Sequence, residues 1–307
     1  LGYRMTSGAD GWDTFWRSSS TSEVLVTDTG ARNPALDAFW ASTLQRVTPQ
    51  QSVVDIGCGA GSLSQGLVRA PALLVGVDIS FAALTRSQSE ASSMHVVQAM
   101  NEQLPFQPGS FDLVVSQFGV EYGGIVALAE ACALVSPGGV LRCLVHCADS
   151  AIQQSAHRDL QHIEVLVTSE FFAAARSLTL ALAAKDQQQL DAASGQFTES
   201  EQAVRAAVEI DASHFAGYSY LGFQSLLRRW ARYEPDDILL WLSRMEEEAD
   251  QGAARLRTMQ SAAMTDTKWR ALASLLSQRG LPSLHRQPVH SSETNHLIGW
   301  EVSQTTL

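Results

Sequence analysis

The sequence predicts an α/β protein with a Rossmann-like, mostly parallel seven-stranded sheet that ends in an antiparallel hairpin. Helices cover both faces, and a large all-helical insertion interrupts the domain. Up to residue 147, unalternated runs of Val, Ile and Leu are separated by helical patterns, which is typical of a parallel sheet covered on both sides. Only helical patterns occur from about residue 151 to residue 280, and two strand-like runs follow. The helical stretch is therefore an insertion and not a separate tail.

Five apolar runs are predicted to be the parallel strands: Ser52–Ile56, Leu73–Val77, His95–Gln98, Phe111–Ser116 and Val140–Val145. A first helix is expected from Pro34, with Asn33 as its N-cap, because proline favours the first helical position. Between the strands, helices are expected to begin near Ser62, Ser80 and Gly124.

The stretch after the fifth strand contains two apolar stripes at helical spacing. They are Leu160, Ile163, Val167, Phe171, Ala174, Leu178 and Leu182, and Ile238, Leu242, Met245, Ala249, Leu256 and Met259. Thr198 and Glu201 have the spacing of a capping box. A short helix is expected over Asp266–Gln278, with Gly280 after its end. The two closing strands are expected at Leu284–Val289 and His296–Ser303, joined by the turn "HSSETN".

These patterns divide the chain into three predicted parts: an N-terminal lid segment (1–32), a core (33–150 and 263–307) and a helical cap over an acceptor site (151–262). Trp12, Phe15 and Trp16 stand out in the otherwise polar N-terminal segment. We expect them either to join the lid or to dock on the outer surface of the cap.

Composition limits the classes of partner. The net charge of −11 argues against nucleic acid as a partner, because phosphate contacts need clustered Lys and Arg. No apolar run is long enough to span a membrane, and no hydrophobic signal region begins the sequence. The four cysteines have neither a disulfide framework nor metal-ligand spacing, so we expect reduced thiols, a cytoplasmic location and no metal. A homodimer remains open.

The stretch "VVDIGCGAGSL" carries the most specific chemistry. Asp55 ends a strand, and Gly57, Gly59 and Gly61 follow at alternate positions, where glycine lets a ligand approach the backbone. A dinucleotide fingerprint has its third glycine one residue later and places a helix N-terminus at a pyrophosphate. An acid at the entry of the loop would repel a pyrophosphate but could bind a cationic group. Asp78 ends the next strand in "VGVDIS", where an acid can accept both hydroxyls of a ribose.

A ligand with a ribose, an ammonium group and no phosphate fits these features, and S-adenosylmethionine is such a ligand. Here the sequence resembles the class I S-adenosylmethionine-dependent methyltransferases of the small-molecule branch. Four motifs carry the resemblance in the family's order: "VVDIGCGAGSL", "VGVDIS", "NEQLPFQPGSFDLVVS" and "ALVSPGGVLRCLVH". It covers roughly residues 33–149 and 264–307 and leaves out the helical insertion.

The resemblance implies roles for individual residues in binding S-adenosylmethionine. Asp55 and the loop Gly57–Gly61 would face the methionine part, although Cys58 within the loop is also a small packing residue. Asp78 would hold the ribose, and Ile79 would pack on the adenine. The family often has an acid at Met100 to contact the adenine amino group, so we shift that contact to Asn101. Two further residues, at the end of the fourth strand, would lie near the sulfonium: Ser116 and Gln117.

The catalytic candidates lie at the expected acceptor side of the sheet. "QFGVEY" follows the fourth strand and should line the acceptor pocket, and it contains Glu121 and Tyr122. His146 ends the fifth strand, at the edge where open α/β sheets bind ligands. His146 is a candidate general base, substrate anchor or packing residue, and as a base it would titrate near its ordinary pKa. Glu121 and Tyr122 are the weaker candidates, with a turn cap and a pocket wall as their alternatives.

The acceptor itself is described only by class. No [DNS]-P-P-[YFW] sequence follows the fourth strand, which argues against methylation of an exocyclic amine. We therefore expect methyl transfer to O, N or S of a small metabolite or natural-product intermediate. The alternatives are a protein methyltransferase whose insertion holds the partner, and a non-catalytic cofactor-binding subunit.

Overall fold

All five predicted parallel strands form in the computed structural model, which describes residues 7–18, 34–90, 93–291 and 294–305. The bounds of β1 (Ser52–Ile56) and β3 (His95–Gln98) are those predicted, and β2 (Leu73–Asp78) and β4 (Phe111–Gln117) each extend one residue further. β5 (Val135–Val145) begins before the predicted start, because the segment "SPGG" continues the strand and its pairing with β4 shifts register there.

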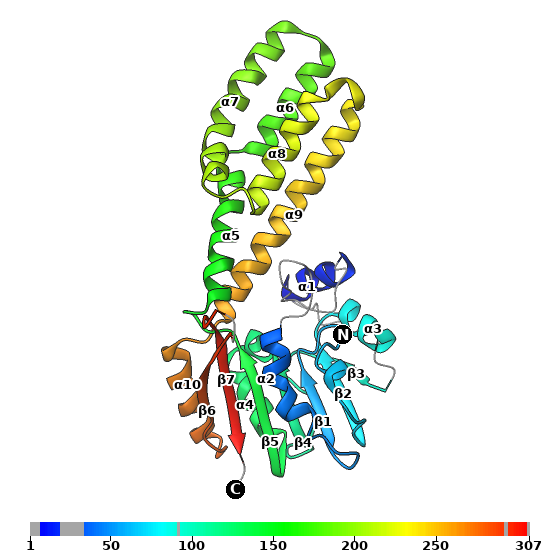
Figure 1. Ribbon diagram of the computed structural model, residues 1–307, viewed down its shortest axis with the longest axis vertical. Coiled ribbons are helices and arrows are strands. Elements are labelled where there is room, and N and C mark those ends of the chain that lie inside the picture. Colours follow the sequence, from blue (N-terminus) through cyan, green and yellow to red (C-terminus); the bar gives the residue numbers. More distant parts are fainter. Residues whose placement is uncertain (1–6, 19–33, 91–92, 292–293, 306–307) are drawn as a thin grey trace, which may run out of the picture. The chain divides into compact units, whose positions relative to one another are not determined.

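The sheet has seven strands in the order β3-β2-β1-β4-β5-β7-β6 (Figure 1). The first five strands are mutually parallel, and the closing hairpin of β6 (His285–His290) and β7 (Leu297–Thr305) joins β5 in antiparallel pairing through β7. The predicted fold class is therefore confirmed. The carboxyl ends of β1, β2 and β4 lie at one edge of the sheet, because these strands are parallel neighbours.

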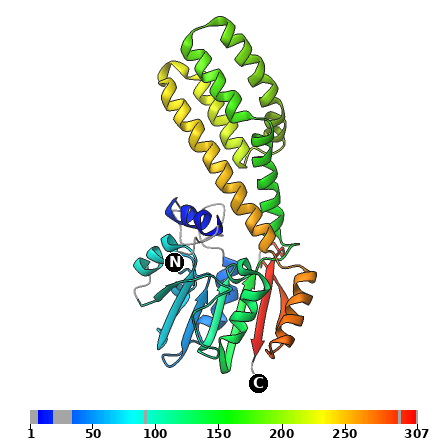
Figure 2. The same cartoon turned by 180° about the vertical axis from the view of Figure 1, so that it is seen from behind.

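Helices cover both faces of this sheet, which Figures 1 and 2 show from opposite sides. Side chains of α2 (Pro34–Leu44) and α3 (Phe81–Glu90) belong to one buried apolar cluster with strand residues, and side chains of α4 (Gly124–Ala133) and α10 (Asp266–Gln278) belong to another. The predicted N-cap Asn33 lies outside the described residues.

One predicted helix is missing from the described structure. Where a helix was expected from Ser62, the chain forms only the short 3-10 helix η1 (Ser64–Gly66) before β2 begins. The connection is short, and Pro71 removes a backbone donor just before the strand. The glycine loop is therefore not followed by the N-terminus of an α-helix.

The chain divides into two compact units: residues 1–154 with 258–307, and residues 155–257. All elements of the second unit are helices. They are α5 (Ala151–Thr168), α6 (Phe171–Ala184), α7 (Gln187–Ile210), α8 (Phe215–Arg228), η3 (Trp230–Arg232) and α9 (Pro235–Ala262). The first and last of them, α5 and α9, also extend into the first unit.

The core of the second unit follows the predicted stripes with two corrections. Val167 is half exposed and Leu166 is buried in its place, because the chain bends between α5 and α6 at Glu170, whose φ is 54°. The predicted capping box at Thr198 is wrong, since Thr198 lies inside α7 and donates to the carbonyl of Ser194. The N-cap of α7 is Asp186, which accepts the N–H of Gln189.

No single helix among the described residues is long and apolar enough to cross a bilayer, whereas α5 and α6, bent by 45°, satisfy the length and composition criteria only as a pair.

Candidate cofactor site

The glycine loop adopts backbone conformations that only glycine tolerates well. Gly57, Gly59 and Gly61 have φ values of 66°, 54° and 83°. A Cβ on Gly57 would lie 2.7 Å from the Cα of Gly119, in the loop after β4, so the two glycines let the ends of β1 and β4 meet. A Cβ on Gly61 would meet Ser87 and Met94. The third glycine therefore serves packing against neighbouring elements of the domain.

Two buried acids lie next to this loop. Asp78 accepts the N–H of Gly59 and the N–H of Ser80, each at 2.9 Å, and so fixes the loop against the end of β2. Asp55 is buried, and neither of its carboxylate oxygens has a hydrogen-bond partner among the described residues. Burial first, and the neighbouring Asp78 second, raise the pKa of Asp55 well above its usual value. Burial likewise raises the pKa of Asp78, against the N–H donors that lower it.

Such an arrangement favours a cationic ligand. A buried carboxylate without a donor is costly, and a second acid beside it adds like-charge repulsion. A positively charged group next to Asp55 and Asp78 would offset both terms. The residues present therefore fit the ammonium and ribose groups that the sequence assigned to this site.

A pocket opens beside the loop. Eight of the residues that the sequence predicted line it: Gly57, Cys58, Gly59, Asp78, Ile79, Asn101, Gln117 and Tyr122. The side chain of Asn101 donates to the carbonyl of Gly119 at 3.0 Å, and Gln117 accepts the indole N–H of Trp40 at 2.6 Å. These bonds hold the two polar side chains at the wall.

Other predicted cofactor residues are not part of the pocket wall. Gly61 packs away from it, and Met100 and Asp55 do not line it. Ser116 is fully buried, donates to the carbonyl of Ile56 at 2.6 Å and accepts the N–H of Val120 at 2.9 Å. Ser116 thus fastens the end of β4 to the end of β1.

The catalytic candidates Glu121 and His146 lie together, but neither lines this pocket. Glu121 is fully buried; one carboxylate oxygen accepts the backbone N–H of His146 at 2.9 Å, and the other has no partner among the described residues. Burial raises the pKa of Glu121 to about 7.

His146 is enclosed by aromatic rings. Its imidazole stacks on Phe118, with ring centres 4.4 Å apart, and lies edge-on to Tyr122 at 6.2 Å. Burial lowers the pKa of His146 to about 3, below the value near 6.5 that an unperturbed imidazole would have. Tyr122 is the only one of the three candidates that lines the described pocket.

Sequence reasoning did not assign cofactor roles to five further residues of the wall: Trp12, Trp16, Ser62, Phe118 and Gly119. The two tryptophans come from the N-terminal helix α1 (Ser7–Ser18). Their aromatic character in a polar segment was a signal, but the sequence did not show that they reach the glycine loop. Phe118 and Gly119 were in the stretch expected to line the acceptor pocket.

Part of the chain is similar to known methyltransferases. Residues 53–139 match a family described as a methyltransferase domain. The malonyl-[acyl-carrier protein] O-methyltransferase of Pseudescherichia vulneris is 31% identical over 123 residues, covering 39% of this chain and 43% of that protein. A ubiquinone biosynthesis O-methyltransferase of Xanthomonas campestris pv. campestris (strain B100) is 36% identical over 100 residues, covering 30% and 42% respectively. This chain thus spans less than half the length of these relatives.

Among solved structures, the YcgJ protein of Bacillus subtilis aligns with 20% sequence identity and a TM-score of 0.36, covering 41% of this chain and 57% of that one. The family match ends before the helical insertion begins. Residues 53–139 are thus similar to a methyltransferase domain.

Proposed function

We propose that this protein transfers a methyl group from S-adenosylmethionine to an oxygen, nitrogen or sulfur atom of a small metabolite or natural-product intermediate. The observation that carries the proposal is the pair of buried acids beside the glycine loop: Asp78 lies on the pocket wall, and Asp55 has no hydrogen-bond donor among the described residues. When bound, S-adenosylmethionine supplies an electrophilic methyl group on a sulfonium.

The chain's own residues bind and orient the cofactor in this proposal. Asp78 keeps acceptor capacity for the ribose hydroxyls beyond its bonds to Gly59 and Ser80. Ile79 and the aromatic residues of the wall supply apolar surface for the adenine. Asp55 compensates the positive charge of the methionine part.

The substrate class is supported by the pocket and by the names of the relatives. The relatives cited above are named for the methylation of a malonyl-[acyl-carrier protein] and for ubiquinone biosynthesis. The net charge of −11 disfavours nucleic acid. The chain leaves β5 beside His146 and returns at Met264, whose N–H donates to the carbonyl of His146 at 2.8 Å, so both ends of the insertion lie at the carboxyl end of β5.

One observation favours a second candidate, in which the insertion holds a protein partner or a protein-bound substrate. Large apolar side chains are exposed on several of its helices: Val167, Leu180, Ile210, Tyr218, Leu221 and Leu240. Tyr218 and Leu221 are three residues apart on α8 and therefore share a face. Exposed apolar surface of this kind marks interaction sites when it is contiguous.

Calorimetric titration with S-adenosylmethionine and S-adenosylhomocysteine tests the proposal. Asp78→Ala should weaken both affinities by about one to two decades, because charge-assisted hydrogen bonds are worth about 1.5–3 kcal/mol. Asp112→Ala is the matched control, since Asp112 lies at the start of β4 and accepts the N–H of Ser52 at 2.8 Å. Unchanged affinity in Asp78→Ala, or no binding by the wild-type protein, would refute the cofactor assignment. A screen of pooled metabolites with methyl-labelled cofactor then identifies the acceptor.

A further inference from the structure

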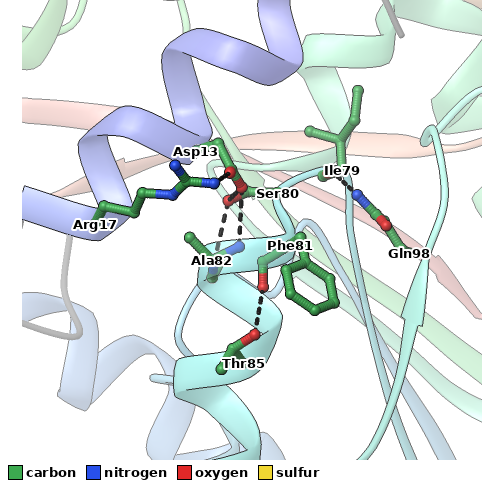
Figure 3. Close-up of polar contacts among 9 residues, drawn as sticks. Asp13, Arg17, Ile79, Ser80, Phe81, Ala82, Thr85 and Gln98 are labelled. Atoms are coloured by element: carbon green, nitrogen blue, oxygen red, sulfur yellow. Dashed lines mark hydrogen bonds and ion pairs between the residues drawn. The ribbon is translucent and has the colours of Figure 1, made fainter. Parts of the chain in front are cut away.

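The helix α1 is fastened to the start of α3 by a single aspartate (Figure 3). One carboxylate oxygen of Asp13 accepts the hydroxyl of Ser80 at 2.8 Å and the backbone N–H of Ala82 at 2.9 Å. The other oxygen accepts a hydrogen bond from Arg17 at 2.8 Å. Ser80 and Ala82 flank the first residue of α3, so an acid from a distant part of the sequence serves the orphan N–H groups of this helix.

Formation of α3 does not depend on this contact alone. The hydroxyl of Ser80 already accepts the N–H of Ala83 at 3.1 Å, which is an N-cap bond from within the chain's own turn. The contribution of Asp13 is therefore mainly to hold α1 in place. Partial burial raises the pKa of Asp13, but the Ala82 N–H, the Ser80 hydroxyl and Arg17 together lower it below its usual value. The carboxylate is charged at neutral pH.

Two tryptophans bring α1 onto the cofactor pocket. Trp16 is buried, and a Cβ placed on Gly59 would lie 2.6 Å from its indole ring. Trp12 packs edge-on against Tyr122, with ring centres 5.3 Å apart. Both tryptophans line the same pocket as Asp78. The absence of a side chain at Gly59 thus makes room for α1 as well as for a ligand.

The anchoring and binding functions meet in one short segment. Asp78 and Ile79 line the pocket, and Ser80 directly after them bonds to Asp13. Asp78 also accepts the N–H groups of Gly59 and Ser80. Any movement of α1 away from Ser80 therefore uncovers Gly59 and opens the wall of the pocket that Trp12 and Trp16 form.

We propose that α1 is a latch on the cofactor pocket, closed by the bonds of Asp13 to Ser80 and Ala82, and that S-adenosyl ligands enter and leave when these bonds release. The identity of the ligand rests on the proposed function. The latch itself rests on the contacts of Asp13, Trp12 and Trp16.

Stopped-flow measurement of S-adenosylhomocysteine release tests the latch directly. Asp13→Ala should accelerate dissociation about tenfold, since two hydrogen bonds to a charged acceptor are lost at a partly exposed site. Asp13→Asn keeps one acceptor oxygen and should give an intermediate rate. Arg86→Ala is the control, because it removes an ion pair with Glu90 within α3. The dissociation rate of S-adenosylhomocysteine from this variant should stay within about twofold of the wild-type rate. Equal dissociation from wild type and Asp13→Ala would overturn the proposal.

Amide hydrogen exchange of residues 7–18 separates the latch from the ligand assignment. In the ligand-free protein, Asp13→Ala should increase exchange in α1 while Arg86→Ala leaves it unchanged; equal exchange in Asp13→Ala and wild type would overturn the latch. Adding S-adenosylhomocysteine should slow amide exchange in wild-type α1. If the ligand binds and exchange in α1 does not slow, the latch proposal would also be overturned. Failure of the wild-type protein to bind would overturn the proposed function, and the ligand-free exchange would still decide the latch.

Discussion

Glu121→Gln should change how the stability of this protein depends on pH. Glu121 is fully buried, and burial raises its pKa to about 7 from the ordinary value of 4.5. Between these two values the unfolded chain has lost the proton and the folded chain has kept it. Stability therefore falls as pH rises through this range, and the full loss is about 3 kcal/mol, at 1.36 kcal/mol per pKa unit.

The assay is urea unfolding of wild type and Glu121→Gln at pH 5 and at pH 8. The linkage relation gives a loss from Glu121 of about 2–3 kcal/mol between these two pH values, which the neutral glutamine does not suffer. Between pH 5 and pH 8, the free energy of unfolding of wild type should therefore fall relative to that of Glu121→Gln by this amount. Other titrating groups, His146 included, are present in both proteins and cancel in the comparison. Parallel stability curves from pH 5 to pH 8 would refute the reasoning, and Glu209→Gln, an exposed residue of α7, is the control expected to follow wild type.

Three further outcomes follow from the site. Gly57→Ala should lose about 2–4 kcal/mol of unfolding free energy in urea, because φ is 66° and the new methyl would meet the backbone of Gly119; a smaller loss would mean that the loops separate easily. Asp55→Asn should lower the affinity for both S-adenosylmethionine and S-adenosylhomocysteine about tenfold in calorimetry, because both ligands carry the ammonium group that Asp55 would compensate; an unchanged affinity contradicts the charge argument. The imidazole of His146 should stay neutral at pH 5 by NMR titration, because burial lowers its pKa to about 3; titration near pH 6.5 would contradict its burial.

The sheet and the glycine loop could be predicted because their signals are local. Each parallel strand is a short apolar run, and its end is marked by an acid or by small residues, as at Asp55 and Asp78. The order of such runs along the chain fixes the order of elements. The hairpin of β6 and β7 was predictable for the same reason, since two strand-like runs flank a polar turn.

Contacts between distant parts of the chain could not be predicted. Asp13 meets Ser80 across 67 positions, and no periodicity in either segment indicates the pairing. The helix expected from Ser62 is a different case, because an apolar pattern was present but only the short 3-10 helix η1 forms before Pro71 and β2. Thr198 had the spacing of a capping box, yet the surrounding residues continue α7 through it.

His146 shows why burial decides a role that residue type leaves open. The sequence placed it correctly at the end of β5, where a general base, an anchor and a packing residue were equal alternatives. Its ring lies on Phe118, whose left-handed backbone (φ 51°) is held by an N–H bond to the carbonyl of Leu144 at 2.7 Å. A strained residue is retained where its surroundings require that conformation.

The stacked pair also affects the choice of a proton acceptor. An imidazole whose pKa is about 3 is a weak base at neutral pH, whereas a carboxylate whose pKa is about 7 matches the pH at which general bases work best. Glu121 holds the backbone of His146 through one oxygen and has a second oxygen without a partner among the described residues. These features favour packing and positioning for His146. Glu121 has the better-matched pKa, but like His146 it does not line the described pocket, so its role as a proton acceptor stays a prediction. Methyl-transfer rates of His146→Phe and Glu121→Gln measured across pH would separate the two, since only loss of the proton acceptor should remove an inflection near pH 7.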